Sequence, residues 1–176
     1  MSLSHLPTNR ATLAAALTGP LLTGVTRVVL GALWVNEGLI KYRAGFGAAD
    51  IQLVVDSASA NSRVPAFFQA FAGNALGGAP EFFGVVMPLL EVGLGVALVL
   101  GVLTLPATLM SALTLMTYWL ADQLTASYPI MVVLTVVVAT WALVASRLSV
   151  TAVVENAVRK RRPTSAWLSE PVRRWL

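Results

Sequence analysis

Three charged side chains and one amide lie in residues 27–41 (RVVLGALWVNEGLIK), a stretch that otherwise has the composition of a membrane span. A charged side chain at the centre of a bilayer costs at least about 2.5–3.5 kcal/mol, so such groups usually face the interior of a helix bundle. On a helix, positions separated alternately by three and four residues share one face. In this stretch and just before it, that face carries Gly24, Arg27, Gly31, Trp34, Gly38 and Lys41, with Asn36 and Glu37 beside it.

A second apolar stretch, PLLEVGLGVALVLGVLTLPA, contains a single acidic residue, Glu91. Because an unpaired charge inside a membrane is costly, we expect Arg27 and Glu91 to form a structural charge pair, or Glu91 to be protonated. The pair can belong to a functional site, or it can serve only to set the helix register. Small residues allow helices to approach closely, so helix packing is predicted at Gly31, Gly38 and Gly95.

The elements that must position these groups are membrane helices. Of the 176 residues, 57% are hydrophobic and 11% are charged, whereas a soluble domain carries about 25% charged residues. Apolar runs cover residues 21–41, 82–101, 105–121 and 129–146, and each approaches the ~20 residues that a spanning helix needs. The sequence therefore predicts an all-α, polytopic membrane protein with a bundle of four transmembrane helices.

The domain organisation follows from these runs. Residues 1–20 form an N-terminal segment, 21–147 the transmembrane domain and 148–176 a basic C-terminal tail. Within the domain, residues 42–80 form a long connection with two short amphipathic helices, whose Phe67, Phe68 and Phe71 suit packing at the membrane surface better than ligand contact.

Orientation follows from the distribution of Lys and Arg. The tail is strongly basic, whereas the 122–128 connection contains no basic residue. Positively charged segments stay on the cytoplasmic side, which predicts cytoplasmic N and C termini and an outer 42–80 connection. We expect a multi-pass protein of a bacterial-type inner (plasma) membrane. The tail suits anionic lipid better than nucleic acid on so apolar a chain.

With this orientation, several polar groups gather in the outer half of the bundle. A small-ligand site is predicted there, formed by Trp34, Glu37, Lys41, Glu91 and Tyr118. Each residue also has a simpler interpretation. Glu37 and Lys41 lie near a helix end, where charged heads extend to water, and Tyr118 can belong to an interfacial aromatic belt.

The composition excludes several kinds of redox centre. The chain has no cysteine and one histidine, His5. It therefore cannot hold a disulfide or an iron–sulfur cluster, and a buried bis-histidine haem site is also excluded. No metal site is expected. If the protein takes part in redox chemistry, the carrier is organic or belongs to a partner.

The first two polar stretches also resemble those of the DoxX-like family. The resemblance rests on RVVLGALWVNEGLIK followed by PLLEVGLGVALVLGVLTLPA in a four-span chain, and it covers roughly residues 20–147. By position, Arg27, Gly31, Gly38, Lys41 and Glu91 match the family pattern. The family is similar in architecture to the membrane subunit of thiosulfate:quinone oxidoreductases, so the resemblance implies a membrane partner of a redox or sulfur-handling enzyme.

Three functions remain open at this point. The chain can be a membrane subunit of a redox complex that binds a quinone or a similar small ligand. In that case Lys41 or Arg27 would donate to a carbonyl, and Glu37 or Glu91 would supply protons. It can instead be a non-catalytic anchor or accessory subunit that docks a partner protein. A small transporter is a weaker alternative, because discontinuous helices and repeats are not apparent.

Overall fold

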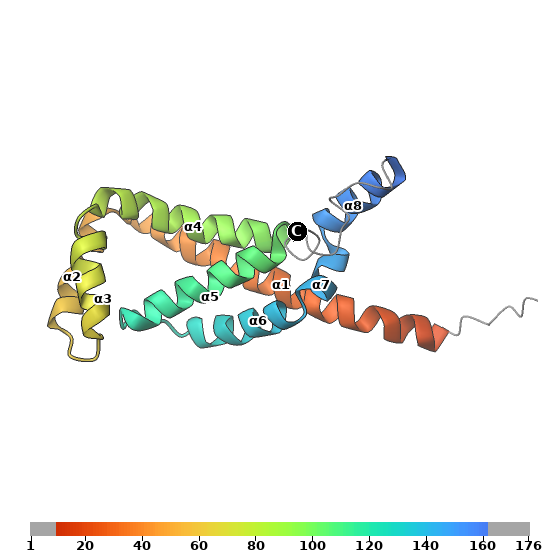
Figure 1. The fold of residues 1–176 in the computed structure, drawn as a ribbon, viewed down its shortest axis with the longest axis horizontal. Coiled ribbons are helices and arrows are strands. Elements are labelled where there is room, and N and C mark those ends of the chain that lie inside the picture. Colours follow the sequence, from red (N-terminus) through yellow and green to blue (C-terminus); the bar gives the residue numbers. More distant parts are fainter. Residues whose placement is uncertain (1–9, 162–176) are drawn as a thin grey trace, which may run out of the picture.

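The computed structural model describes the backbone of residues 10–161 and the side chains of residues 18–161, and this part of the chain is helical without strands (Figure 1). The long helices are α1 (Arg10–Ala44), α4 (Pro80–Leu100), α5 (Thr104–Leu120) and α6 (Tyr128–Thr140). The shorter ones are α2 (Ala48–Ala60), α3 (Ala66–Phe71), the π-helical turn η1 (Ala72–Leu76), α7 (Ala142–Ala145), the 3-10 turn η2 (Ser146–Leu148) and α8 (Val150–Arg161).

Helices α1 and α4 form the most extensive contact in the fold, and glycines allow it. A Cβ atom at Gly31 would stand 2.8 Å from the carbonyl oxygen of Gly95, and one at Gly38 would stand 3.0 Å from the carbonyl oxygen of Pro88. Gly95 likewise faces the backbone of Val35. The backbones therefore touch along this line, and the two helices run antiparallel with Gly31 opposite Gly95.

Two helices are long and apolar enough to cross a membrane, Thr18–Ala44 within α1 and Pro80–Leu100. A third span results if Tyr128–Thr140 and Ala142–Leu148 are counted together, although they meet at an angle of 89°. The prediction of one continuous helix over 129–146 is therefore wrong. The break falls at Trp141, whose ψ of 34° is not helical.

Helix α1 begins at Arg10, so residues expected in a separate N-terminal segment extend the first helix through Pro20. A proline inside a helix removes one backbone hydrogen bond. His5 and the tail residues Arg162, Arg173 and Arg174 lie outside the described residues. The described part of the tail is α8, which ends with Arg159, Lys160 and Arg161.

Helices α2, α3 and η1 form a cap at one end of the bundle, and α8 lies toward the opposite end (Figure 1). We call these the cap end and the tail end. The cap has its own apolar core, which includes Ile51, Val64 and Phe68 and reaches Ala121 at the end of α5. The cap therefore packs on the bundle through apolar contacts.

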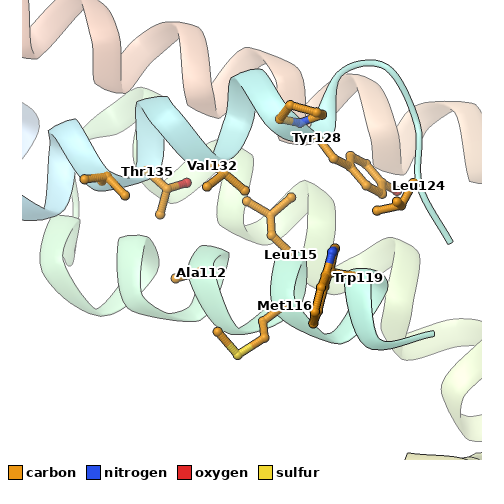
Figure 2. Close-up of a pocket in the computed structure, with 10 residues that line it drawn as sticks. Ala112, Leu115, Met116, Trp119, Leu124, Tyr128, Val132 and Thr135 are labelled. Atoms are coloured by element: carbon orange, nitrogen blue, oxygen red, sulfur yellow. The ribbon is translucent and has the colours of Figure 1, made fainter. Parts of the chain in front are cut away.

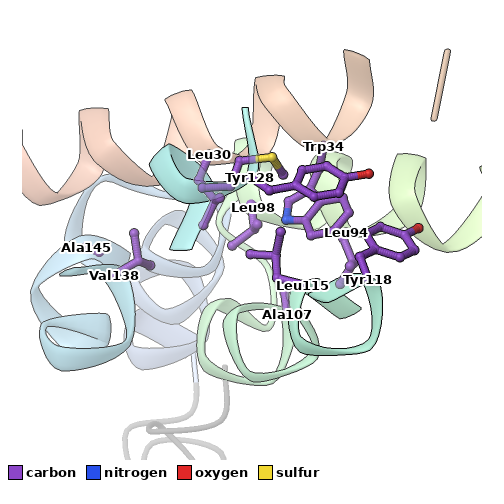
Figure 3. Packing of buried hydrophobic residues seen from close by; sticks show 11 residues of the cluster. Leu30, Trp34, Leu94, Leu98, Ala107, Leu115, Tyr118, Tyr128, Val138 and Ala145 are labelled. Carbon is purple, nitrogen blue, oxygen red and sulfur yellow. The ribbon is translucent and has the colours of Figure 1, made fainter. Parts of the chain in front are cut away.

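The bundle has a buried apolar core and an apolar exterior. Trp34, Leu98, Met131 and Val138 are fully buried, and they join helices α1, α4 and α6 (Figure 3). Large apolar side chains also cover the outside, for example Leu113 on α5, which is 57% exposed. Apolar side chains on both faces of a helix are typical of a bundle embedded in lipid.

Candidate ligand site at the cap end

The polar centre of the bundle is Glu91 on α4, whose side chain is fully buried. Its Oε1 accepts a hydrogen bond from Lys41 Nζ of α1 at 2.6 Å and another from Tyr118 OH of α5 at 2.5 Å. One carboxylate oxygen thus joins three helices. The other oxygen, Oε2, is buried without a hydrogen-bond partner among the described residues.

The predicted pair of Arg27 and Glu91 does not form. The contact of Gly31 with Gly95 places Arg27 beside Gly101, whereas Glu91 lies level with the segment from Gly38 to Lys41. Arg27 and Lys41 are about 21 Å apart along α1 at 1.5 Å per residue, which is too far for one carboxylate to serve both. Antiparallel register therefore decides which cation meets Glu91.

Arg27 lies buried at the tail end and is 2% exposed. Its Nη2 donates a hydrogen bond to the carbonyl oxygen of Leu148 at 3.0 Å. Its Nε and Nη1 have no partner within the described part of the chain. Arg27 thus fastens the turn η2 onto α1 rather than belonging to the cap-end site.

A cavity of about 200 Å³ lies between the cap and the bundle, beside the Lys41–Glu91–Tyr118 cluster. Lys41, Tyr118 and Tyr128 of the bundle line it. The cap contributes mostly apolar walls, including Phe46 just before α2, Ile51, Val54, Phe68 and Phe71, and α4 adds Phe83 and Met87. Such a cavity, apolar with a few convergent polar groups, is the usual form of a small-ligand site.

Aromatic rings position the polar groups of this cavity. The rings of Tyr118 and Tyr128 stack with a centroid distance of 5.3 Å and an interplanar angle of 17°. Lys41 Nζ lies 5.4 Å from the Tyr118 ring centroid and 5.9 Å from that of Phe46, within the range of cation–π attraction. The ammonium group is therefore held by one carboxylate and two ring faces.

Of the five residues predicted to form the ligand site, only Lys41 and Tyr118 line the cavity. Glu91 lies behind them as their common acceptor. Trp34 is fully buried in the core, where its Nε1 donates to Ser111 Oγ at 2.7 Å (Figure 3). Glu37 accepts a hydrogen bond from Ser127 Oγ, just before α6, at 2.9 Å. Trp34 and Glu37 therefore connect α1 with α5 and with the start of α6 instead of lining the cavity.

Sequence reasoning missed Tyr128 as a residue of the site. Tyr128 follows a polar connection and precedes Pro129, so it has the pattern of an ordinary helix start. Phe68 and Phe71, for which packing at the membrane surface was favoured over ligand contact, line the cavity, whereas Phe67 is 65% exposed. A helix of six residues carries too short a pattern to indicate which of three phenylalanines faces inward.

A polar clasp fastens the cap to the bundle. Asn61 Nδ2 donates to Asp122 Oδ2 at 2.7 Å, and the Arg63 guanidinium pairs with the same carboxylate oxygen. Both contacts lower the pKa of Asp122 below its ordinary value, and the contact with Arg63 has the larger effect. Asp122 has a φ of 56°, in the left-handed region that aspartate and asparagine tolerate best after glycine.

The arrangement offers one hydrogen-bond donor with N–H groups to spare, Lys41 Nζ, at a mostly apolar cavity near the end of the bundle. Tyr118 OH gives its one proton to Glu91 and can only accept a further hydrogen bond. A carbonyl oxygen is an acceptor that fits the ammonium donor. Among the described residues there is no group of three or more His, Cys, Asp or Glu that could hold a metal ion. Comparison of the chain with protein-family models, curated proteins and solved structures finds no match.

Proposed function

We propose that this chain is the membrane subunit of a quinone-linked redox complex and binds the head group of a quinone, or a similar small carbonyl compound, in the cap-end cavity. The observation that carries the proposal is the placement of Lys41 and Tyr118. Both residues line the cavity, and the buried carboxylate of Glu91 orients the Nζ of Lys41 and the OH of Tyr118. The resemblance of the polar stretches to the DoxX-like family favours the same assignment.

The site suits quinone chemistry in two respects. A quinone carbonyl accepts hydrogen bonds, and its reduction to the hydroquinone consumes two electrons and two protons. Lys41 can donate to the carbonyl and pass protons to it, with Glu91, which accepts from Lys41 and from Tyr118, as the group that exchanges protons with Lys41. Electrons come from a partner protein, because the chain has no cysteine and one histidine.

The proposed placement in the membrane uses four spans, α1, α4, α5 and the bent pair of α6 with α7 and η2. Helix α5 has 17 residues, or about 25 Å, which approaches the ~30 Å of the hydrocarbon. The cap then lies at the outer surface of a bacterial-type plasma membrane. The basic α8 and tail face the cytoplasm and anionic lipid.

The alternative function is a non-catalytic anchor for a partner protein. The observation that favours it is that Lys41 and Tyr118 both bond to Glu91, an arrangement that could serve only to join three helices. A cluster of this kind would specify register without binding a ligand.

A cavity-filling pair of variants separates the two functions. Val54 lines the cavity, whereas its neighbour Leu53 is 66% exposed on the same helix. We expect Val54→Trp to lower the quinone content of protein purified in lipid nanodiscs at least tenfold, with Leu53→Trp unchanged. Wild-type protein that retains no quinone while a partner co-purifies would establish the anchor instead.

A further inference from the structure

The outside of the bundle is hollowed between α5 and α6 (Figure 2). This α5–α6 groove has a volume of about 570 Å³ and is lined from Ala112 to Trp119 on α5 and from Tyr128 to Val136 on α6. Its walls are almost entirely apolar. The hydroxyl oxygen of Thr135 lies 3.1 Å from Ser111 Oγ, and this hydrogen bond satisfies Thr135 without a ligand in the groove.

The groove and the cap-end cavity meet at one side chain. Tyr128 lines both hollows, and its ring stacks on Tyr118, which bonds to Glu91 beside the cavity donor Lys41. In Figure 2, Tyr128 and Trp119 lie at the end of the groove nearest the α5–α6 connection. The two hollows are therefore adjacent at Tyr128, and a molecule that occupies both has to pass the ring of this side chain.

The surroundings of the groove determine what can fill it. Large apolar side chains border it, among them Met116, which is 60% exposed, and Val136, which is also 60% exposed. Water needs two to four polar partners and finds few on these walls. An empty hollow would forfeit dispersion contacts with its lining atoms. An apolar chain is thus the matching occupant, and from Tyr128 to Val136 it has about 12 Å of helix to follow.

We propose that the ligand of the cap-end cavity is a prenylated quinone whose isoprenoid tail lies in the α5–α6 groove. The inference rests on the proposed function and adds to it the place where the tail of the ligand binds. A cavity with a few polar groups at its wall, next to an almost entirely apolar groove, fits one molecule with a polar head and an apolar tail. The head then meets Lys41, and the tail meets only apolar side chains. A tail held in this way raises affinity for long-chain quinones over their tailless heads.

Two adjacent valines on α6 provide the test. Val132 lines the groove and is 47% exposed, whereas Val133 does not line it and is 62% exposed. Val132→Phe and Val133→Phe would be prepared in nanodiscs of one lipid composition. Binding of a benzoquinone with a multi-isoprene tail and of the corresponding tailless benzoquinone would then be titrated against each protein.

We expect Val132→Phe to lower affinity for the tailed quinone about tenfold and to leave affinity for the tailless quinone unchanged. Val133→Phe should match the wild type for both. Equal affinity of the two valine variants for the tailed quinone would overturn the groove assignment while leaving the head site intact. Absence of binding of either quinone to the wild type would instead refute the proposed function itself.

Occupancy of the groove by a second copy of the chain has a different signature. In that case Val132→Phe would convert a dimer to a monomer in analytical ultracentrifugation, with no change in quinone affinity. Occupancy by ordinary phospholipid would leave the wild type with equal affinity for tailed and tailless quinone, once their partitioning into the membrane is subtracted. Either result contradicts the proposal.

Discussion

The guanidinium of Arg27 lies directly against the backbone of Gly101. A Cβ atom built on Gly101 would stand 1.7 Å from Nη1 of Arg27, closer than any non-bonded contact allows. Gly101 ends α4 with a φ of 70°, a conformation that side chains also disfavour. The position therefore requires glycine for two independent reasons, and the buried arginine depends on it.

Substitution of this glycine should destabilise the tail end. Gly101→Ala should lower the free energy of unfolding by about 1–2 kcal/mol, because alanine disfavours the left-handed backbone. Displacement of Arg27 should lower it further. Gly93→Ala provides the control, because Gly93 is exposed within α4 and a Cβ there meets no atom within 4 Å. That change should be neutral or stabilising by up to about 1 kcal/mol. Thermal unfolding in detergent measures both, and equal melting temperatures for the two variants would contradict the assignment.

The pairing of Lys41 with Glu91 predicts a specific double-mutant result. Glu91→Gln should lower the free energy of unfolding by about 3 kcal/mol, because it leaves a mostly buried ammonium without its anion. Lys41→Met combined with Glu91→Leu should recover much of this loss. In contrast, the effects of Arg27→Met and Glu91→Leu on the free energy of unfolding should be additive, since the two sites are far apart. Strong coupling between Arg27 and Glu91 would show that the register described above is wrong.

Closure of the cap should depend on pH through Asp122. Arg63 and Asn61 lower the pKa of Asp122 in the folded state. The contribution of Asp122 to the stability of the closed cap is therefore present above its unfolded-state pKa and is lost as the pH falls through its folded-state pKa. We expect hydrogen-exchange protection factors of residues 48–76, corrected for intrinsic rates, to decrease below about pH 4. Asp122→Asn should reduce protection at pH 7 and weaken this dependence. Asp56→Asn, on the exposed side of α2, should behave like the wild type.

The proposed orientation can be tested with single cysteines, since the chain has none of its own. Cysteine at Ser57, in the cap, should react with an impermeant thiol reagent in intact cells, because the proposed orientation places the cap outside. Cysteine at Ser165, in the basic tail, should react only after the membrane is opened. The reverse labelling pattern would invert the proposed topology.

Much of the framework could be predicted from residue spacing. Glycines at 31 and 38, seven residues apart, indicated a close helix contact, and α1 and α4 meet along that line. The pairing of charges could not be predicted in the same way. Arg27 and Lys41 lie on the same face of α1, and only the register against α4 decides that Lys41 meets Glu91.

Two other features lacked a local signal. The segment VVVATWALVA contains neither proline nor glycine, yet the chain bends by 89° at Trp141. Packing of α7 against α1 and α5, rather than a helix-breaking residue, accompanies this bend. Tyr128 likewise belongs to the site because it lines the cavity and stacks on Tyr118, and neither contact is apparent from the sequence around it. Such contacts depend on tertiary neighbours that a single sequence does not reveal.

The early bend after α6 has a consequence for the surrounding bilayer. Helix α6 has 13 residues and α5 has 17, or about 20 Å and 25 Å, whereas Thr18–Ala44 of α1 extends about 40 Å. In the proposed membrane placement, one flank of the protein is therefore too short for a hydrocarbon layer of ~30 Å and the other is too long. Lipid beside α5 and α6 should thin, while α1 tilts, and this hydrophobic mismatch would favour residence in thin membranes.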